Sequence, residues 1–202
     1  MNLRFTDEWI PGTILKKSDM ENLTGLDFLK KVFFVSEGVM LTQIRAISGI
    51  DSSTLQNWTK RGWIVNSRSK KYNMDQVAHI LIINMLRSCM RLDHIDFLIH
   101  YINGDVADMS DDIISDAELY DYICRILEYI IQTDECALDS IGTVVREMTA
   151  ENYVEPLPGA KERLDNALEV IVVTYYSALM KRHADTLLEE LIHPSADGMK
   201  IK

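Results

Sequence analysis

The sequence predicts a mainly α-helical protein, with two short helices and a small two-stranded loop near its middle and an all-α helical bundle after them. Apolar side chains recur at three- and four-residue spacing through most of the 202 residues, as they do on the buried faces of helices. Only four prolines and nine glycines interrupt the pattern. Between Leu41 and Tyr72 the rhythm changes, because a glycine and then a run of basic residues separate short apolar segments.

The first short helix is predicted to begin near Thr42 and to end at Gly49. A glycine there can adopt the left-handed conformation of a helix C-terminus without a steric penalty. Ile50 is expected to fill the angle between this helix and the next, which Asp51 or Ser52 begins as its N-cap. The inward faces of the two helices carry apolar side chains at three-residue spacing: Leu41, Ile44 and Ile47 in the first, Leu55 and Trp58 in the second.

The second helix is followed by a segment that resembles a short hairpin. After Arg61-Gly62, the residues Trp63-Ile64-Val65 are predicted to form a strand, Asn66 to Lys71 a turn, and Tyr72 the returning strand. Two helices, a tight turn between them and a basic two-stranded wing are the order typical of a winged helix-turn-helix domain.

This arrangement makes double-stranded DNA the expected partner. The outer face of the second helix carries side chains that hydrogen-bond base edges or phosphates in a major groove, and the tip of the wing carries cations that would contact the sugar-phosphate backbone. The predicted DNA-binding residues are Thr42, Ser52, Ser53, Gln56, Asn57, Lys60, Arg61, Arg68, Lys70, Lys71 and Tyr72.

Charge is distributed unevenly along the chain. The net charge is −10, which taken alone argues against a polyanionic partner. Residues 41–91, however, hold eight lysines and arginines and two aspartates, whereas residues 92–202 hold eight cations and 23 anions. A basic segment attached to an acidic body would orient an encounter with DNA. Chance clustering on an ordinary solvated surface is the alternative interpretation.

Three regions are expected. Residues 1–40 form an N-terminal segment with one helix, from Leu23 to Val35 and capped by Thr24, that packs on the rest. Residues 41–104 form the winged domain together with two further helices, the second ending at Asn103-Gly104. Residues 105–202 form the acidic all-α C-terminal domain, with an aspartate-rich linker up to Ser115.

The C-terminal domain is predicted to contain three helices, separated by a break at Pro156 to Gly159. Their cores are Leu119 to Ile131, Leu138 to Met148 and Leu164 to Ile192. The last helix is apolar nearly all round over residues 170–176, so it lies at the centre of a bundle or in a homodimer interface. A small-molecule effector pocket lined by aromatic side chains is a third possibility: Tyr120, Tyr122, Tyr129, Met148, Tyr153, Tyr175 and Tyr176.

The residues of the first half resemble a known family. Leu41 to Ile50, then Ser53 to Trp58 and Arg61 to Ile64, are similar to the DNA-binding domain of MerR-type regulators, and Asp75-Gln76-Val77 resembles the start of that family's helix after the wing. Gln56 stands where those proteins usually have an arginine, and no heptad-patterned terminal dimerisation helix is evident. Including the acidic half, the closest overall resemblance is to the bacterial family called domain of unknown function 1836.

Other classes of function find little support. No stretch approaches the roughly 20 apolar residues of a membrane span, and the N-terminus lacks the pattern of a secretory signal, so a cytoplasmic protein is expected. The three cysteines (Cys89, Cys124 and Cys136) are expected to be buried free thiols. The histidines His94 and His100 point to opposite helix faces, so no metal site, cofactor or enzymatic activity is expected. The alternative to a regulator is a protein-protein interaction module that uses the helix-turn-helix as a scaffold without binding DNA.

Overall fold

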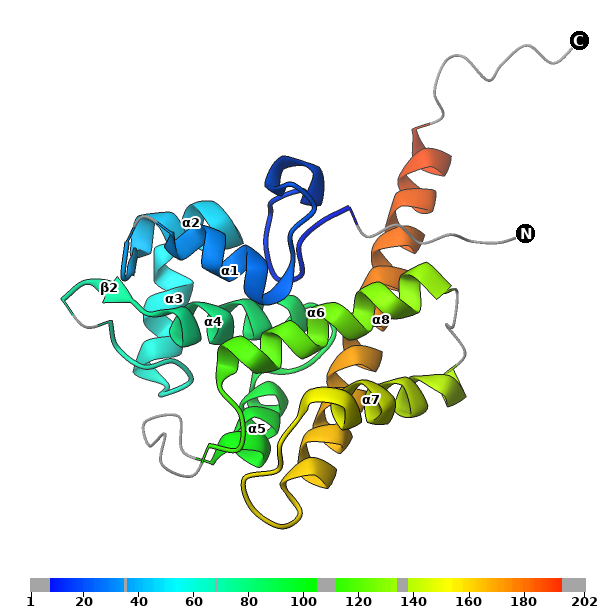
Figure 1. Ribbon diagram of the computed structural model, residues 1–202. Helices are drawn as coiled ribbons and strands as arrows, with labels where there is room; N and C mark the ends of the chain where they lie inside the picture. The colour runs from blue at the N-terminus through cyan, green and yellow to red at the C-terminus, as the bar shows by residue number, and fades with distance from the viewer. Residues whose placement is uncertain (1–7, 35, 68, 105–111, 134–137, 194–202) are drawn as a thin grey trace, which may run out of the picture.

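The computed structural model describes residues 8–34, 36–67, 69–104, 112–133 and 138–193, with the side chains of 138 and 139 left out. Eight α-helices, one 3-10 helix and two short strands make up this part of the chain, which confirms the mainly α prediction (Figure 1). In chain order the elements are η1 (Lys17–Met20), α1 (Gly25–Phe33), β1 (Val39–Met40), α2 (Leu41–Ser48), α3 (Ser52–Lys60), β2 (Lys71–Tyr72), α4 (Met74–Leu86), α5 (Leu92–Asn103), α6 (Asp116–Thr133), α7 (Leu138–Asn152) and α8 (Ala160–Ile192).

Helix α4 is the centre of the packing. Nine of its 13 residues are buried, from Val77 to Leu86, because α6, α8, α1, α2 and α5 all contact it. Buried apolar side chains form a single cluster that runs from Ile10 to Leu179 and includes both halves of the chain. The predicted domain boundary after residue 104 therefore remains a prediction. The hydrophobic core is continuous across that boundary.

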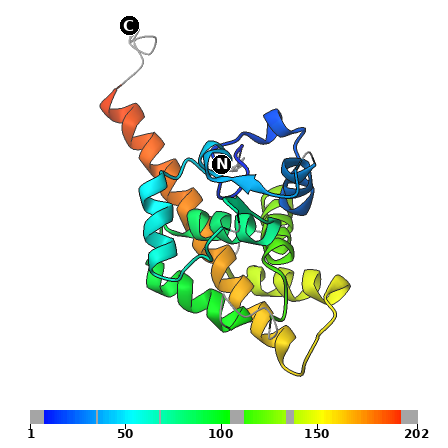
Figure 2. The ribbon, with the colours of Figure 1, turned by 90° about the vertical axis from the view of Figure 1, so that its left-hand side faces the viewer.

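Helix α8 is the longest element and leaves the core before it ends. Its buried residues run from Ala160 to Leu179, and the remaining turns project beyond the body of the molecule (Figures 1 and 2). The elements α2, α3 and β2 lie at the opposite side in Figure 1. Within the described residues, no helix combines the length and the apolar character that crossing a membrane requires.

Helix α1 is held by carboxylates of α6 rather than by its own cap. Thr24 is its N-cap residue as predicted, but the Thr24 hydroxyl donates to Glu128 Oε1 at 3.0 Å instead of bonding to the helix. The free amide of Leu26 donates to Asp121 Oδ1 at 2.7 Å. The N-terminal segment thus packs largely against α6, and the backbone bond from Ile14 N to Ile47 O at 2.9 Å joins it to α2.

The predicted hairpin between Trp63-Val65 and Tyr72 is wrong. The strand β2 pairs instead with β1, antiparallel, with Val39 opposite Tyr72 and Met40 opposite Lys71. Residues 63–65 form no strand, because the Trp63 N–H donates to Trp58 O at the end of α3 and the Trp63 carbonyl accepts from the His79 ring. These bonds take the backbone groups that a strand partner would need.

The thiol prediction is correct for one cysteine and wrong for another. Cys124 is buried in α6, and burial raises the pKa of its thiol to about 12, so it stays protonated. Cys89 is exposed, because it lies in the turn after α4 rather than on a packed helix face. Cys136 and most of the predicted aspartate-rich linker lie outside the described residues.

Candidate nucleic-acid interface and an adjacent pocket

The turn between α2 and α3 has the geometry that the sequence predicts. Gly49 ends α2 with a φ of 72°, and its N–H donates to Arg45 O at 2.9 Å. Ile50 is buried between the helices. Asp51 caps α3 by accepting a hydrogen bond from the Thr54 N–H at 2.8 Å. Local bonds therefore fix the orientation of α3 relative to α2.

Helix α3 is buried on one side and exposed on the other. Leu55 and Trp58 are each about 1% exposed and anchor the inner face. The outer face consists of exposed polar side chains at the spacing of one helix face: Ser53, Gln56, Asn57 and Lys60. Ser52, at the start of the helix, is half-buried.

One anion stands at the start of this outer face. The hydroxyls of Ser53 and Thr54 and the Thr54 N–H all donate to Asp51, so the pKa of that carboxyl is well below its usual range. Asp51 is therefore charged at neutral pH and would repel a phosphate placed beside it. The Ser53 hydroxyl is occupied by this cap, which leaves Gln56 and Asn57 as the uncharged side chains with amide groups on the face.

The basic loop ends in a tight turn beside β2. Ser69 and Lys70 both have positive φ values, 50° and 64°, which is the left-handed region that L residues rarely adopt. Lys70 and Lys71 are exposed at this turn, whereas the side chain of Tyr72 is buried and packs in the core. The structure therefore does not place Tyr72 among the exposed groups, and Arg68 lies outside the described residues.

The remaining predicted residues lie at the ends of the two helices. Thr42 is exposed in the first turn of α2. Arg61 is exposed after α3, with its guanidinium 5.1 Å from the centre of the Trp63 ring. Arg87, which was not among the predicted site residues, lies 5.8 Å from the ring of Trp58 and adds an exposed cation next to α3. The sequence does not predict the contact between Arg87 and Trp58, because the two residues are far apart in the chain.

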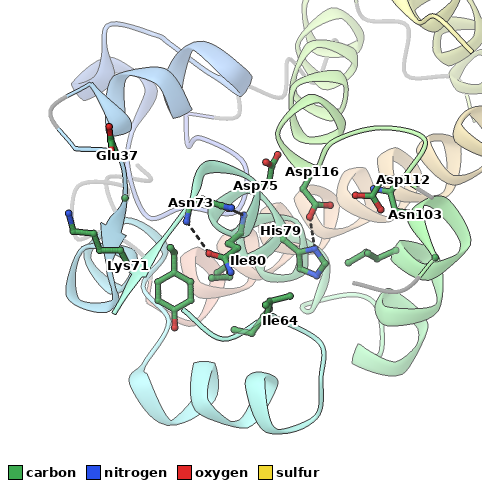
Figure 3. A pocket seen from close by; sticks show the side chains of 16 residues that line it. Glu37, Ile64, Lys71, Asn73, Asp75, His79, Ile80, Asn103, Asp112 and Asp116 are labelled. Carbon is green, nitrogen blue, oxygen red and sulfur yellow. Dashed lines mark hydrogen bonds and ion pairs between the residues drawn. The ribbon is translucent and has the colours of Figure 1, made fainter. Parts of the chain in front are cut away.

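A pocket opens behind this surface, between the ends of the basic loop and helices α4, α5 and α6 (Figure 3). Its volume is about 360 Å³. Apolar side chains of Ile64, Tyr72, Ile80 and Ile99 contribute to its wall. The charged side chains in the lining are Glu37, Lys71, Asp75, His79, Asp112 and Asp116. None of the aromatic residues predicted for an effector pocket in the C-terminal half lines this one.

His79 is the buried polar residue of the pocket. Its Nδ1 lies 2.9 Å from Asp116 Oδ2, and its Nε2 lies 2.9 Å from the carbonyl oxygen of Trp63. Burial alone would lower the pKa of this imidazole, but the Asp116 carboxylate, together with the Trp63 carbonyl and the charge of Asp96, raises it above its ordinary value. The sequence alone gives no signal for His79, because this residue stands in the apolar run of α4 and no histidine or cysteine lies near it in the chain.

The polar donors at the inner end of the pocket are already engaged. Asn103 Nδ2 donates to Ile114 O at 2.6 Å, and Asn103 Oδ1 accepts from the amides of Ile113 and Ile114. The Asp75 carboxylate accepts from the Ala117 N–H at 3.1 Å and so caps the start of α6. Among the described residues, no group of three or more histidine, cysteine, aspartate or glutamate side chains is arranged to hold a metal ion.

Comparison with known proteins places the chain in a family. The model of the family described as domain of unknown function (DUF1836) matches residues 19–123, from η1 into α6. The chain belongs to this family. The match includes α2, α3, the basic loop and His79 with Asp116, so the surface and the pocket both lie in the part that defines the DUF1836 family.

One curated relative is similar over a longer stretch. The uncharacterized protein YkrK of Bacillus subtilis (strain 168) is 26% identical over 153 residues, which is 71% of this chain and 64% of the relative. The chain thus covers less than two thirds of that relative's length. No solved structure matches the chain.

Proposed function

We propose that this DUF1836 protein is a DNA-binding transcriptional regulator. The observation that carries the proposal is the two-sided character of α3. Its inner face is buried through Leu55 and Trp58, while Gln56, Asn57 and Lys60 are exposed in the part of the chain that the structure describes. With α2 and the Gly49 turn before it, α3 has the form of the second helix of a helix-turn-helix. The resemblance of residues 41–64 to MerR-type regulators supports the same assignment.

In the proposed complex α3 enters the major groove. The amide side chains of Gln56 and Asn57 are suited to paired hydrogen bonds with an adenine edge, and Lys60 and Arg61 to a phosphate or a guanine. The turn at Lys70 and Lys71 acts as the wing and contacts the backbone, although its sheet is formed with β1 rather than as a hairpin. Thr42, at the exposed start of α2, is placed for a further phosphate contact.

The proposed regulator is a homodimer in the cytoplasm. Past Leu179, α8 has no buried residue, yet it carries large apolar side chains that are 44–78% exposed: Met180, Leu187, Leu188, Leu191 and Ile192. Met180, Ala184, Leu187 and Leu191 follow alternating spacings of four and three residues, the spacing of a coiled-coil seam, over a stretch too short to give the long heptad pattern of a MerR-type dimerisation helix. A second copy of the chain that covers this seam would present two α3 helices to two half-sites.

The experiment is selection of duplex DNA from a pooled genomic library by the purified full chain, followed by binding measurements over a salt series. The expected result is enrichment of one palindromic site whose affinity falls with salt. Lys70→Ala/Lys71→Ala should lower the salt slope by up to about 2, because each lost phosphate contact removes roughly 0.9. Lys16→Ala/Lys30→Ala is the matched control, since it removes two exposed lysines outside α2, α3 and the basic loop and should leave the slope unchanged.

Two results would contradict the proposal. If no duplex is retained near physiological salt, or if the Lys16/Lys30 control lowers the slope as much as the wing variant does, α3 and the wing do not form the DNA-binding surface. The first result would favour the alternative of a protein-protein interaction module, with the exposed end of α8 as its contact surface.

A further inference from the structure

The pocket behind the basic loop joins elements that are distant in the chain. Ile64 and Val65 enter it from the start of the loop and Lys71 to Asn73 from its end. The remaining walls come from α4, α5, the start of α6, the residues next to α5 and α6, and Glu37 and Gly38 before β1 (Figure 3). Its volume of about 360 Å³ lies within the range of roughly 300–1,000 Å³ that small-molecule sites occupy. Most of the surface that its wall exposes is apolar, which also fits that class of site.

The pocket lining offers more hydrogen-bond acceptors than donors to a ligand. Both ring nitrogens of His79 are engaged, with Asp116 and with the Trp63 carbonyl, and the amide nitrogen of Asn103 is engaged with Ile114. The carboxylates are different, because each has about four lone-pair positions and can accept further hydrogen bonds beside those it already makes, such as the one that Asp75 accepts from Ala117. The pocket therefore has capacity to accept hydrogen bonds, while the ring nitrogens of His79 and the amide nitrogen of Asn103 are already used.

The charge of the lining agrees with this. Four carboxylates border the pocket (Glu37, Asp75, Asp112 and Asp116) against one lysine and one histidine. Lys71 is exposed at the rim, and the charge of His79 is balanced by Asp116 at 2.9 Å. An anion would meet the charge of four carboxylates here and find the His79 and Asn103 donors engaged, whereas an ammonium or amidinium group would meet acceptors of opposite charge.

We propose that this pocket binds a small organic cation, a primary amine or amidine with a compact apolar group, and that the bound cation changes the affinity of the protein for DNA. The cationic group contacts Asp75 and Asp112, and the apolar group packs on Ile64, Ile80 and Ile99. The second half of the proposal rests on the proposed DNA binding. Its physical basis is that Ile64, Val65, Lys71 and Tyr72 flank the basic loop, so a ligand that packs against them alters how Lys70 and Lys71 are presented.

The test begins with the full chain without DNA. Three cations of different shape (2-phenylethylammonium, benzamidinium and n-hexylammonium) are titrated by calorimetry and two-dimensional NMR, with the neutral 2-phenylethanol and the anion 3-phenylpropanoate as shape-matched comparisons. We expect at least one cation to bind, to shift the signals of Ile64, Ile80 and Ile99, and to bind at least about 10-fold more tightly than either comparison molecule, a difference of about 1.4 kcal/mol.

Two double variants identify the site. Asp75→Asn/Asp112→Asn should weaken cation binding by at least about 10-fold, while the asparagine at position 75 can still accept the Ala117 N–H and keep the cap of α6. Asp93→Asn/Asp185→Asn removes the same charge from exposed positions of α5 and α8 and should not change binding. Thermal unfolding of all variants verifies that each is folded.

The outcomes separate the two halves of the proposal from the proposed function. If no cation binds at millimolar concentration, or if the Asp75/Asp112 variant binds as the wild type does, the pocket is not a cation site, whatever the DNA result. If a cation binds and DNA is retained, but the cation changes DNA affinity by less than about 5-fold, the lower end of typical coupling, the regulatory half is overturned. Failure of DNA retention alone leaves the cation-binding result intact.

Discussion

The imidazole of His79 and the carboxylate of Asp116 connect α4 to the start of α6, with 2.9 Å between Nδ1 and Oδ2. The other ring nitrogen lies 2.9 Å from the Trp63 carbonyl, which can only accept a hydrogen bond. A neutral imidazole has one N–H, so both bonds are made together by the doubly protonated ring with a charged Asp116. This partly buried ion pair holds the loop after α3 against the core of the molecule.

The pair predicts a pH dependence of stability. Because the folded-state pKa of His79 is raised above the ordinary value of about 6.5, its contribution is fully present below that value and is lost as the pH rises through the folded pKa. In His79→Leu the Asp116 and Trp63 acceptors lose their donor, which should cost about 1–3 kcal/mol near pH 6 and less at higher pH. Urea unfolding of the wild type and of His79→Leu from pH 5 to pH 9 measures this cost and its decrease with rising pH.

Asp116→Asn is the control for this prediction. It retains an acceptor for His79 but removes the charge, so burial dominates and lowers the pKa of the imidazole. The contribution of His79 should then be lost as the pH falls rather than as it rises. A wild-type minus His79→Leu difference that stays constant from pH 5 to pH 9 would contradict the assignment of a charged pair.

The sequence predicts the parts of this structure that depend on local chemistry. The end of α2 at Gly49 and the Asp51 cap follow from residues within four positions of each other, so the pattern is sufficient. The position of β1 does not follow, because a strand of two residues has no periodicity. The partner of His79 is 37 residues away in the chain, and the pocket exists only where five separate segments meet. Such contacts depend on tertiary packing.

Gly49 predicts a measurable difference from Gly62. Both glycines have a positive φ, 72° and 80°, so alanine at either position should cost about 1–2 kcal/mol from the backbone conformation. At Gly49 an added Cβ would also lie 2.7 Å from Ile14 Cγ2, whereas nothing lies within 4 Å of one at Gly62. Gly49→Ala should therefore be the more destabilising variant in urea unfolding.

Ile14→Ala is the matched test of that steric cost. Ile14 is itself exposed, so its loss alone should change the free energy of unfolding by little. Combined with Gly49→Ala it should return the cost to that of Gly62→Ala. Equal destabilisation by the two glycine variants, or no recovery in the Ile14 background, would show that the contact between the N-terminal segment and α2 is not rigid.

The outer face of α3 predicts a separation of specificity from salt dependence. Gln56→Ala/Asn57→Ala removes uncharged side chains, so it should reduce the preference for the selected site over random DNA by about 1–3 kcal/mol per lost paired contact while leaving the salt slope unchanged. Lys70→Ala/Lys71→Ala should lower the salt slope and leave the preference for the selected site unchanged. Competition binding at two salt concentrations measures both quantities, and a fall in slope with the Gln56/Asn57 variant would place α3 outside the groove.

The exposed end of α8 predicts that the protein is a dimer whose interface can be removed without unfolding the chain. Leu187→Glu/Leu191→Glu places two charges on the proposed seam, beyond the last buried residue of α8, so thermal stability of the core should be preserved while the dimer dissociates. Val154→Glu/Leu157→Glu is the control, since both side chains are exposed in the α7–α8 connection. Light scattering should give twice the 23.2 kDa chain mass for the wild type and the control, and the single mass for the α8 variant. A monomeric wild type would mean that the apolar end of α8 contacts another partner. A dimeric α8 variant would mean that the dimer forms through another surface.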